Sequence, residues 1–73
     1  MLNLDLNMSE VEMNFPKGIS VSVTFTDGSC SQYSDVTEVH HKFNGSNHIA
    51  IESDMRSQGL TIELSRILSV TIG

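Results

Sequence analysis

Three histidines are the residues of this chain best suited to hold a metal ion. His40 and His41 are adjacent, and His48 follows a short distance along the chain. Neighbouring side chains of an extended chain point to opposite faces, so a strand followed by an odd-length loop places His40 and His48 on one face and His41 on the other. Two imidazoles make a weak site because zinc usually has three or four ligands. Glu38 or Asp54 would be a further ligand only if the loops placed its carboxylate beside the histidines. We therefore expect solvated histidines at positions 40 and 48, a hydrogen-bonded and half-buried His41, no metal ion and no other cofactor.

Cys30 is the only cysteine and the only candidate for a nucleophilic thiol. It lies between Ser29 and Ser31, with no glycine elbow around it and no base placed by the sequence, so we expect a small core residue. The acidic residues show no spacing that pairs two carboxylates for acid–base catalysis. Asp27-Gly28 and Asn44-Gly45 are turn signals rather than phosphate-binding loops, because no helix start follows either of them. The sequence therefore favours a protein that is not an enzyme.

The chain is acidic and its few basic residues are scattered. Of its 73 residues, nine are Asp or Glu and four are Lys or Arg, which gives a formal net charge of −5. A nucleic-acid-binding protein normally gathers positive charge against the phosphates, so direct binding of DNA or RNA is disfavoured. An acidic surface suits a protein partner with a basic surface, although it also serves solubility alone. The acids expected beside turns or on outer faces form the candidate partner-binding set: Asp27, Asp35, Glu38, Glu52 and Asp54.

The cysteine count and the N-terminal segment indicate the compartment. A single cysteine cannot form an internal disulfide, which is typical of a protein in the reducing cytoplasm. The first leucines alternate with polar residues, so the N-terminus reads as neither a signal peptide nor a membrane span. We therefore expect a cytoplasmic protein with no membrane partner.

Residues 19–25 carry the clearest structural signal. Apolar residues occupy every second position, and Ser or Thr fills the positions between them. A period of two is typical of a half-buried strand, and Asp27-Gly28 then allows a tight reversal. Strict pairing across a two-residue turn would set Val23 against a glutamine. We therefore expect either a bulge near Ser31-Gln32 that turns Tyr33 inward or a short strand that ends in a loop.

Residues 2–8 also alternate as a strand would. This strand pairs either within the domain or, through Leu2, Leu4 and Leu6, with another chain as an oligomer interface. The alternation changes phase at Ser9-Glu10, which indicates either a bulge in an extended chain or a short helix capped by Ser9. We favour the extended chain because a helix of this length would be marginal.

Three further features complete the expected strand order. Pro16-Lys17-Gly18 reads as a turn that joins the strands on its two sides into a hairpin. The reversal at Asn44-Gly45 needs an odd loop of about three or five residues, because only an odd loop matches the apolar faces of the strands it joins. Residues 65–67 break the alternation as a single 3₁₀ turn would, and residues 68–72 are expected to be a last strand tied into the sheet.

The succession of strands from residue 19 to residue 72 resembles the small SH3-like barrels, including short proteins of bacterial viruses. The stretches that carry the resemblance are VTFTDGS, YSDVTEV, HIAIES and LTIELSRILSVTI. Together with the two-residue period, the resemblance implies an all-β fold. The expected form is a small antiparallel, partly open SH3-like barrel of about five to seven short strands with at most one short helical turn. The chain would be a single β domain over residues 1–73, with 1–15 as an N-terminal extended arm or strands and 19–72 as the SH3-like core.

The expected function is that of a small, acidic, non-enzymatic protein-binding module in the cytoplasm of a bacterial host cell. Its most specific form is a phage-encoded inhibitor of a bacterial defence protein, in the manner of anti-CRISPR proteins. Two alternatives stay open. One is a homo-oligomeric structural or assembly protein joined through the N-terminal leucines, and the other is a small-ligand sponge that holds a nucleotide signal.

Overall fold

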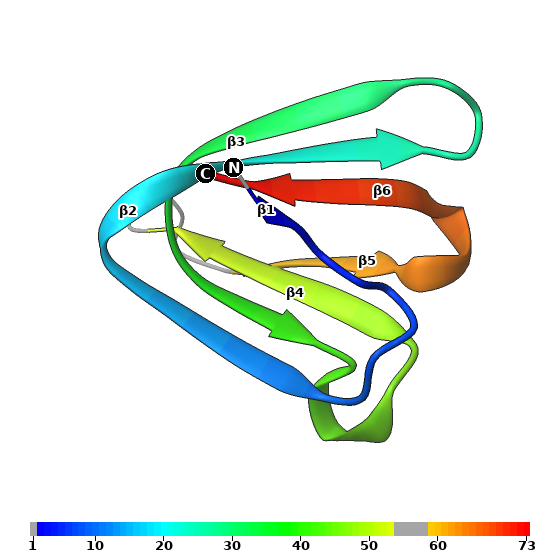
Figure 1. The fold of residues 1–73 in the computed structure, drawn as a ribbon, viewed down its shortest axis with the longest axis horizontal. Coiled ribbons are helices and arrows are strands. Elements are labelled where there is room, and N and C mark those ends of the chain that lie inside the picture. The colour runs from blue at the N-terminus through cyan, green and yellow to red at the C-terminus, as the bar shows by residue number, and fades with distance from the viewer. Residues whose placement is uncertain (1, 54–58) are drawn as a thin grey trace.

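The computed structural model describes residues 2–53 and 59–73, which form one antiparallel sheet (Figure 1). The spatial order of the strands is β1-β6-β2-β3-β4-β5, and the strands at the two ends of this order do not pair, so the sheet is not closed. Among the described residues, the elements are β1 (Leu2–Asn3), β2 (Val11–Phe25), β3 (Cys30–His41), the 3₁₀ turn η1 (Phe43–Gly45), β4 (His48–Ser53), β5 (Leu60–Glu63), the 3₁₀ turn η2 (Leu64–Arg66) and β6 (Ile67–Ile72). The prediction of a small, open, all-β antiparallel fold is confirmed. None of the helical turns in the described ranges is long and apolar enough to cross a membrane.

Two long strands, β2 and β3, run through both halves of the sheet. Residues 11–14 of β2 pair with the last residues of β3, which in turn pair with β4 and then β5. Residues 21–24 of β2 pair with the first residues of β3 on one side, and residues 21–25 pair with β6 on the other. Because both long strands bend together, as Figure 1 shows at the left, the sheet folds over itself and encloses its apolar side.

The bend lies where a hairpin turn was predicted. Pro16-Lys17-Gly18 belongs to β2, and the pairing with β3 shifts register between Asn14 and Ile19. Gly18 has a φ of 73° and Asp35, in the facing stretch of β3, has a φ of 56°. The hairpin prediction is wrong because β3 is long enough to pair on both sides of the irregularity, and proline is tolerated in a strand at such a bulge.

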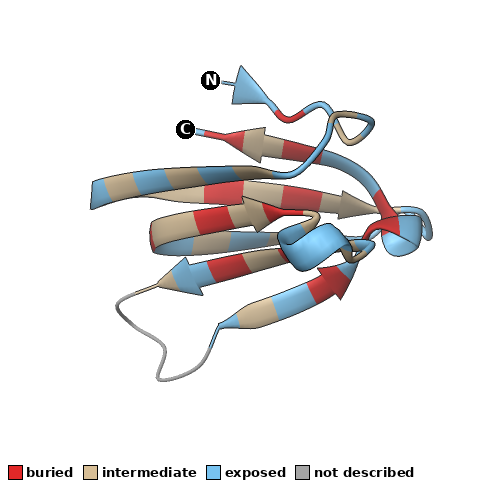
Figure 2. Cartoon of the chain, turned by 90° about the horizontal axis from the view of Figure 1, so that it is seen from below, coloured by how far each residue is buried: buried red, intermediate tan, exposed pale blue. Residues whose placement is uncertain are grey.

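The core is built from every second residue of the strands. Figure 2 shows buried residues alternating with more exposed ones along the chain. His41 is completely buried among these apolar side chains, and its Nδ1 lies 3.3 Å from the carbonyl oxygen of Ser9. The expected hydrogen bond of His41 is thus present, but the side chain is fully rather than half buried. The apolar core residues are Leu4, Val21, Val23, Val36, Val39, Ile49, Ile51, Ile62, Leu64, Ile67, Val70 and Ile72.

The turn between β2 and β3 sets the register of the long hairpin. The N–H of Phe25 donates to the carbonyl of Ser29 at 2.8 Å, and Thr24 lies opposite Cys30. The connection is therefore one residue longer than the strict two-residue turn, and this places Ser31 rather than a glutamine against Val23. The bulge predicted near Ser31-Gln32 is absent from this ladder because the turn already corrects the register. The same register leaves Cys30 exposed, so its prediction as a core residue is wrong.

The loop between β3 and β4 has an odd number of residues, as predicted. The N–H of Lys42 donates to the carbonyl of His48 at 2.9 Å, so the loop consists of the five residues 43–47. Val39 then faces Ile51, and both are buried. By alternation alone, Phe43 would continue the inward face of Val39 and His41. It is instead 46% exposed, because the left-handed backbone of Lys42 turns the chain out of the strand.

The two ends of the chain meet at β6. The predicted 3₁₀ turn is present as η2, and β6 lies between β1 and β2, so the last strand is tied into the sheet as expected. The N-terminal strand pairs within the chain but covers only Leu2–Asn3. The prediction of a strand through residue 8 is wrong because the side chain of Asp5 accepts the N–H of Asn7 and its carbonyl accepts the N–H of Met8, which forms a turn. Residues 11–15 are extended, as favoured from the sequence.

Candidate functional site

The outer surface of strands β2 to β5 brings together two histidines and four glutamates. Paired residues of adjacent strands point to the same face, so the pairing register shows which side chains share this surface. One row joins Glu12 to His40, and the next joins Asn14 to Glu38 and Glu38 to Glu52. We use the name acidic face for the surface formed by six of these outward residues: Glu12, Glu38, His40, His48, Glu52 and Glu63.

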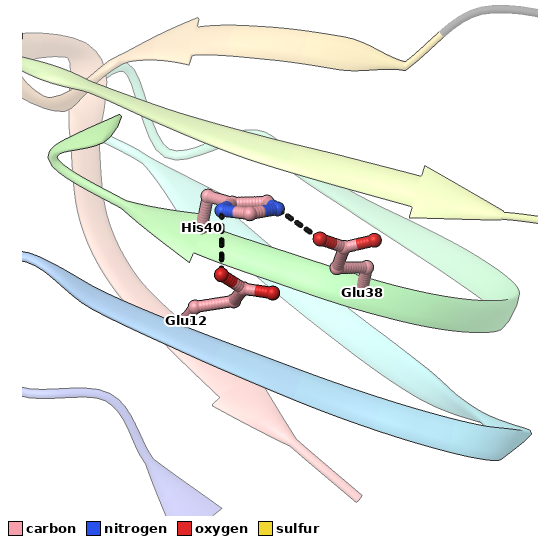
Figure 3. A group of neighbouring side chains, drawn as sticks. All are labelled: Glu12, Glu38 and His40. Atoms are coloured by element: carbon pink, nitrogen blue, oxygen red, sulfur yellow. Dashed lines mark hydrogen bonds and ion pairs between the residues drawn. The ribbon is translucent and has the colours of Figure 1, made fainter. Parts of the chain in front are cut away.

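His40 lies between two carboxylates (Figure 3). Its Nε2 is hydrogen-bonded to Oε1 of Glu38, and its Nδ1 lies 3.9 Å from Oε2 of Glu12. The imidazole side chain retains only 15% of its exposure, while Glu12 retains 54%. The ring of Phe43 meets the imidazole edge to face, with ring centroids 5.1 Å apart. His40 is therefore held by neighbours on three sides, unlike the solvated surface residue expected from the sequence.

Negative charge accumulates on the acidic face without a basic counterpart in the described ranges. Glu38 and Glu52 are directly opposite each other on β3 and β4. Within residues 2–53 and 59–73, the only ion pairs of these glutamates are the two contacts with His40. Lys42 instead lines a groove of about 580 Å³ beside the N-terminal segment, and Arg66 lies over the ring of Phe25 at 5.8 Å. Among residues 2–53 and 59–73, the face therefore presents carboxylates without a Lys or Arg partner.

The structure separates the acids that the sequence proposed as one partner-binding set. Glu38 and Glu52 come together, whereas Asp27 lies in the β2–β3 turn and Asp35 at the bend. Asp54 lies outside the described residues. Sequence reasoning did not select Glu12 or Glu63, although both occupy polar positions of alternating strands. The alternation indicates that both side chains face outward, but the residues beside them depend on which strands pair.

Asp27 has its own local partners at the turn. The hydroxyl of Ser29 donates to Oδ1 of Asp27 at 2.6 Å, and the N–H of Ser29 donates to the same oxygen at 2.9 Å. These hydrogen bonds, first the hydroxyl and then the N–H, lower the pKa of Asp27 below its ordinary value, because both stabilise the charged carboxylate. Asp27 therefore has a structural role in the turn that is independent of a partner.

The N-terminal leucines differ sharply in their surroundings. Leu4 is a core residue of its own chain, only 7% exposed, and Leu6 is half-buried against the same core. Leu2 is 56% exposed. An oligomer interface through all three leucines would require Leu4 to leave the core. Of the three, Leu2 is the one that is largely exposed.

Comparisons of the chain with protein-family models, curated proteins and solved structures find no match.

Proposed function

We propose that this chain is a non-enzymatic protein-binding module whose acidic face binds a basic surface of another protein. The single observation that carries the proposal is the gathering of Glu12, Glu38, Glu52 and Glu63 from four strands on one face, without a Lys or Arg ion pair among the described residues. Charges of one sign on a rigid sheet steer and orient a partner of the opposite sign.

Phe43 supplies an aromatic anchor at the border of this surface. It is 46% exposed and contacts His40, a member of the acidic face. Aromatic residues that become buried in a partner frequently dominate binding energy, whereas rim charges mainly set association rate and specificity. The proposed interface therefore combines the acidic face with Phe43 as its apolar contact.

The most specific form of the proposal is an inhibitor, encoded by a bacterial virus, that covers the nucleic-acid channel of a bacterial defence protein. A channel that holds nucleic acid is lined with basic residues against the phosphates. A compact acidic face competes for those residues by charge and by steric exclusion. In this form the chain acts in the cytoplasm of the host cell and does not itself contact nucleic acid.

The proposal is tested with two charge-matched double variants of the full chain. Glu52→Gln/Glu63→Gln removes two charges from the acidic face, and Asp27→Asn/Asp35→Asn removes two charges elsewhere. Each variant and the unchanged chain are immobilised and used to capture proteins from bacterial lysate, with elution by increasing salt. We expect one stoichiometric partner that elutes with salt, is retained by the Asp variant and is weakened in the Glu variant. Addition of the unchanged chain to that partner should block its binding of nucleic acid.

Capture that resists salt, or that is lost equally in both variants, contradicts the role of the acidic face. A captured partner whose nucleic-acid binding is unaffected contradicts inhibition while leaving protein binding in place. Recovery of the chain's own copies alone supports the assembly alternative instead.

A further inference from the structure

Whether each ring nitrogen of His40 carries a proton or a lone pair decides its contacts with the neighbouring carboxylates. Carboxylates of Glu38 and Glu12 face its two ring nitrogens, at Nε2 and Nδ1 respectively. A neutral imidazole has one N–H donor and one lone pair, so only one of its nitrogens can donate to a carboxylate. The other nitrogen then presents its lone pair to a negative oxygen. A proton on that nitrogen removes this repulsion, because the imidazole then donates on both sides. A metal ion bound to the same lone pair also removes it, with the carboxylate oxygen as a second ligand.

The three donors lie close to the spacing that a single ion needs. One ligand atom from each of Glu12, Glu38 and His40 can be chosen so that all lie within 4.8 Å of one another. Zinc binds imidazole nitrogen and carboxylate oxygen at about 2.0–2.2 Å, so two donors on one ion lie no more than about 4.4 Å apart. An imidazole binds a single ion through one nitrogen, so the carboxylate that faces the other nitrogen has to move toward the ion. Glu12 has the most room to do so, because its side chain is the most exposed of the three.

The surroundings hold the donors in place. Glu12 and His40 are directly opposite each other on β2 and β3, and Glu38 is two residues from His40 on the same face of β3. The side-chain amide of Asn14 donates a hydrogen bond to Oε1 of Glu12 at 3.4 Å. The ring of Phe43 covers one side of the imidazole. Two adjacent strands therefore present the three side chains together, and no loop has to close over them.

We infer that Glu12, Glu38 and His40 form a binding site for a divalent transition-metal ion of the zinc class. An imidazole nitrogen with two carboxylates suits zinc and its neighbours, whereas calcium and magnesium prefer sites made entirely of oxygen. Three protein ligands leave a coordination position for water or for a group from another molecule. The inference does not depend on the proposed protein partner, since the cation is bound by side chains of this chain alone.

A chelator-competition titration tests the site. The purified full chain, freed of metal, is titrated with zinc at neutral pH against a chromophoric chelator. We expect one zinc per chain, with affinity lowered by at least about tenfold in His40→Ala and in Glu38→Gln, because each removes a ligand. Circular dichroism checks that each variant is folded, and Glu38→Gln, which preserves side-chain shape, decides the result if His40→Ala does not fold.

The neighbouring pair His48 and Glu63 offers a matched control. These residues also lie opposite each other on the acidic face, on β4 and β5, but belong to no described group of three donors. His48→Ala, Glu63→Gln and the exposed thiol variant Cys30→Ser should each retain zinc affinity. The inference is overturned if the unchanged chain does not bind zinc, if folded Glu38→Gln or His40→Ala binds it undiminished, or if His48→Ala loses it to the same extent. Because no partner protein is present, a failure here is distinct from a failure of the proposed protein binding.

Discussion

Glu38 on β3 and Glu52 on β4 are directly opposite each other, with both side chains on the outer face of the sheet. Like charges in this arrangement oppose the pairing of the two strands, so the pair lowers the stability of the fold. The cost of this repulsion can be measured.

Replacement of Glu52 by glutamine should stabilise the isolated chain. The variant Glu52→Gln keeps the side-chain shape and removes the repulsion with Glu38, so the free energy of unfolding should rise by about 0.2–1 kcal/mol. Urea unfolding measures the change, and added salt should reduce it because the charges are exposed. Glu63→Gln, opposite His48, is the control and should not show this gain. A loss of stability in Glu52→Gln would show that the glutamate makes a favourable contact instead.

Ile49 tests the packing of the hydrophobic core, because it is completely buried between His41 on β3 and Ile62 on β5. Ile49→Ala should lower the free energy of unfolding by about 2–5 kcal/mol, and Ile49→Val by about 0.5–1.5 kcal/mol, because each leaves a cavity of different size. Leu68→Ala is the control, since Leu68 is 66% exposed and its loss should change stability by less than about 0.5 kcal/mol. Chemical unfolding gives all three values, and equal effects at positions 49 and 68 would refute the assigned sheet faces.

The bend of the long hairpin depends on Gly18. An added Cβ would lie 3.1 Å from the Cα of Asp35, and the backbone has a φ of +73°. Gly18→Ala should therefore destabilise the chain by more than the roughly 1–2 kcal/mol expected for an L-residue in the left-handed region. Gly45→Ala is a matched control with the same φ and open space around the Cβ position. Equal destabilisation of the two variants, measured by thermal unfolding, would show that contact with Asp35 is unimportant.

Asp27 makes a pH-dependent contribution to stability through the lowering of its pKa, caused first by the Ser29 hydroxyl. A carboxyl whose pKa is lower in the folded state stabilises the fold at pH values above its unfolded-state pKa, and this contribution disappears as the pH falls through the folded-state pKa. Asp27→Asn should therefore be less stable than the unchanged chain at neutral pH, and the difference should shrink in acid. In an NMR titration, Ser29→Ala should move the Asp27 midpoint upward, and an unmoved midpoint would exclude the hydroxyl as its cause.

Alternation along the sequence predicted much of the local structure correctly. The inward residues Val21 and Val23, the odd loop before β4 and the 3₁₀ turn before β6 all follow from the two-residue period of side chains in a strand. The bend at Pro16-Lys17-Gly18 was mistaken for a reversal because proline and glycine favour both. Only the continuous pairing of β2 with a long β3 distinguishes a bend from a turn.

The sequence by itself determined that the chain is an antiparallel β protein with acidic outward positions, since period and composition are local properties. Tertiary structure alone decided that Glu12 lies opposite His40 and that Glu38 lies between Asn14 and Glu52. The physical reason is that alternation assigns a side chain to a face but does not specify which strand lies beside it. Strand order and register depend on how all the apolar faces, together with the buried His41, fit into one core.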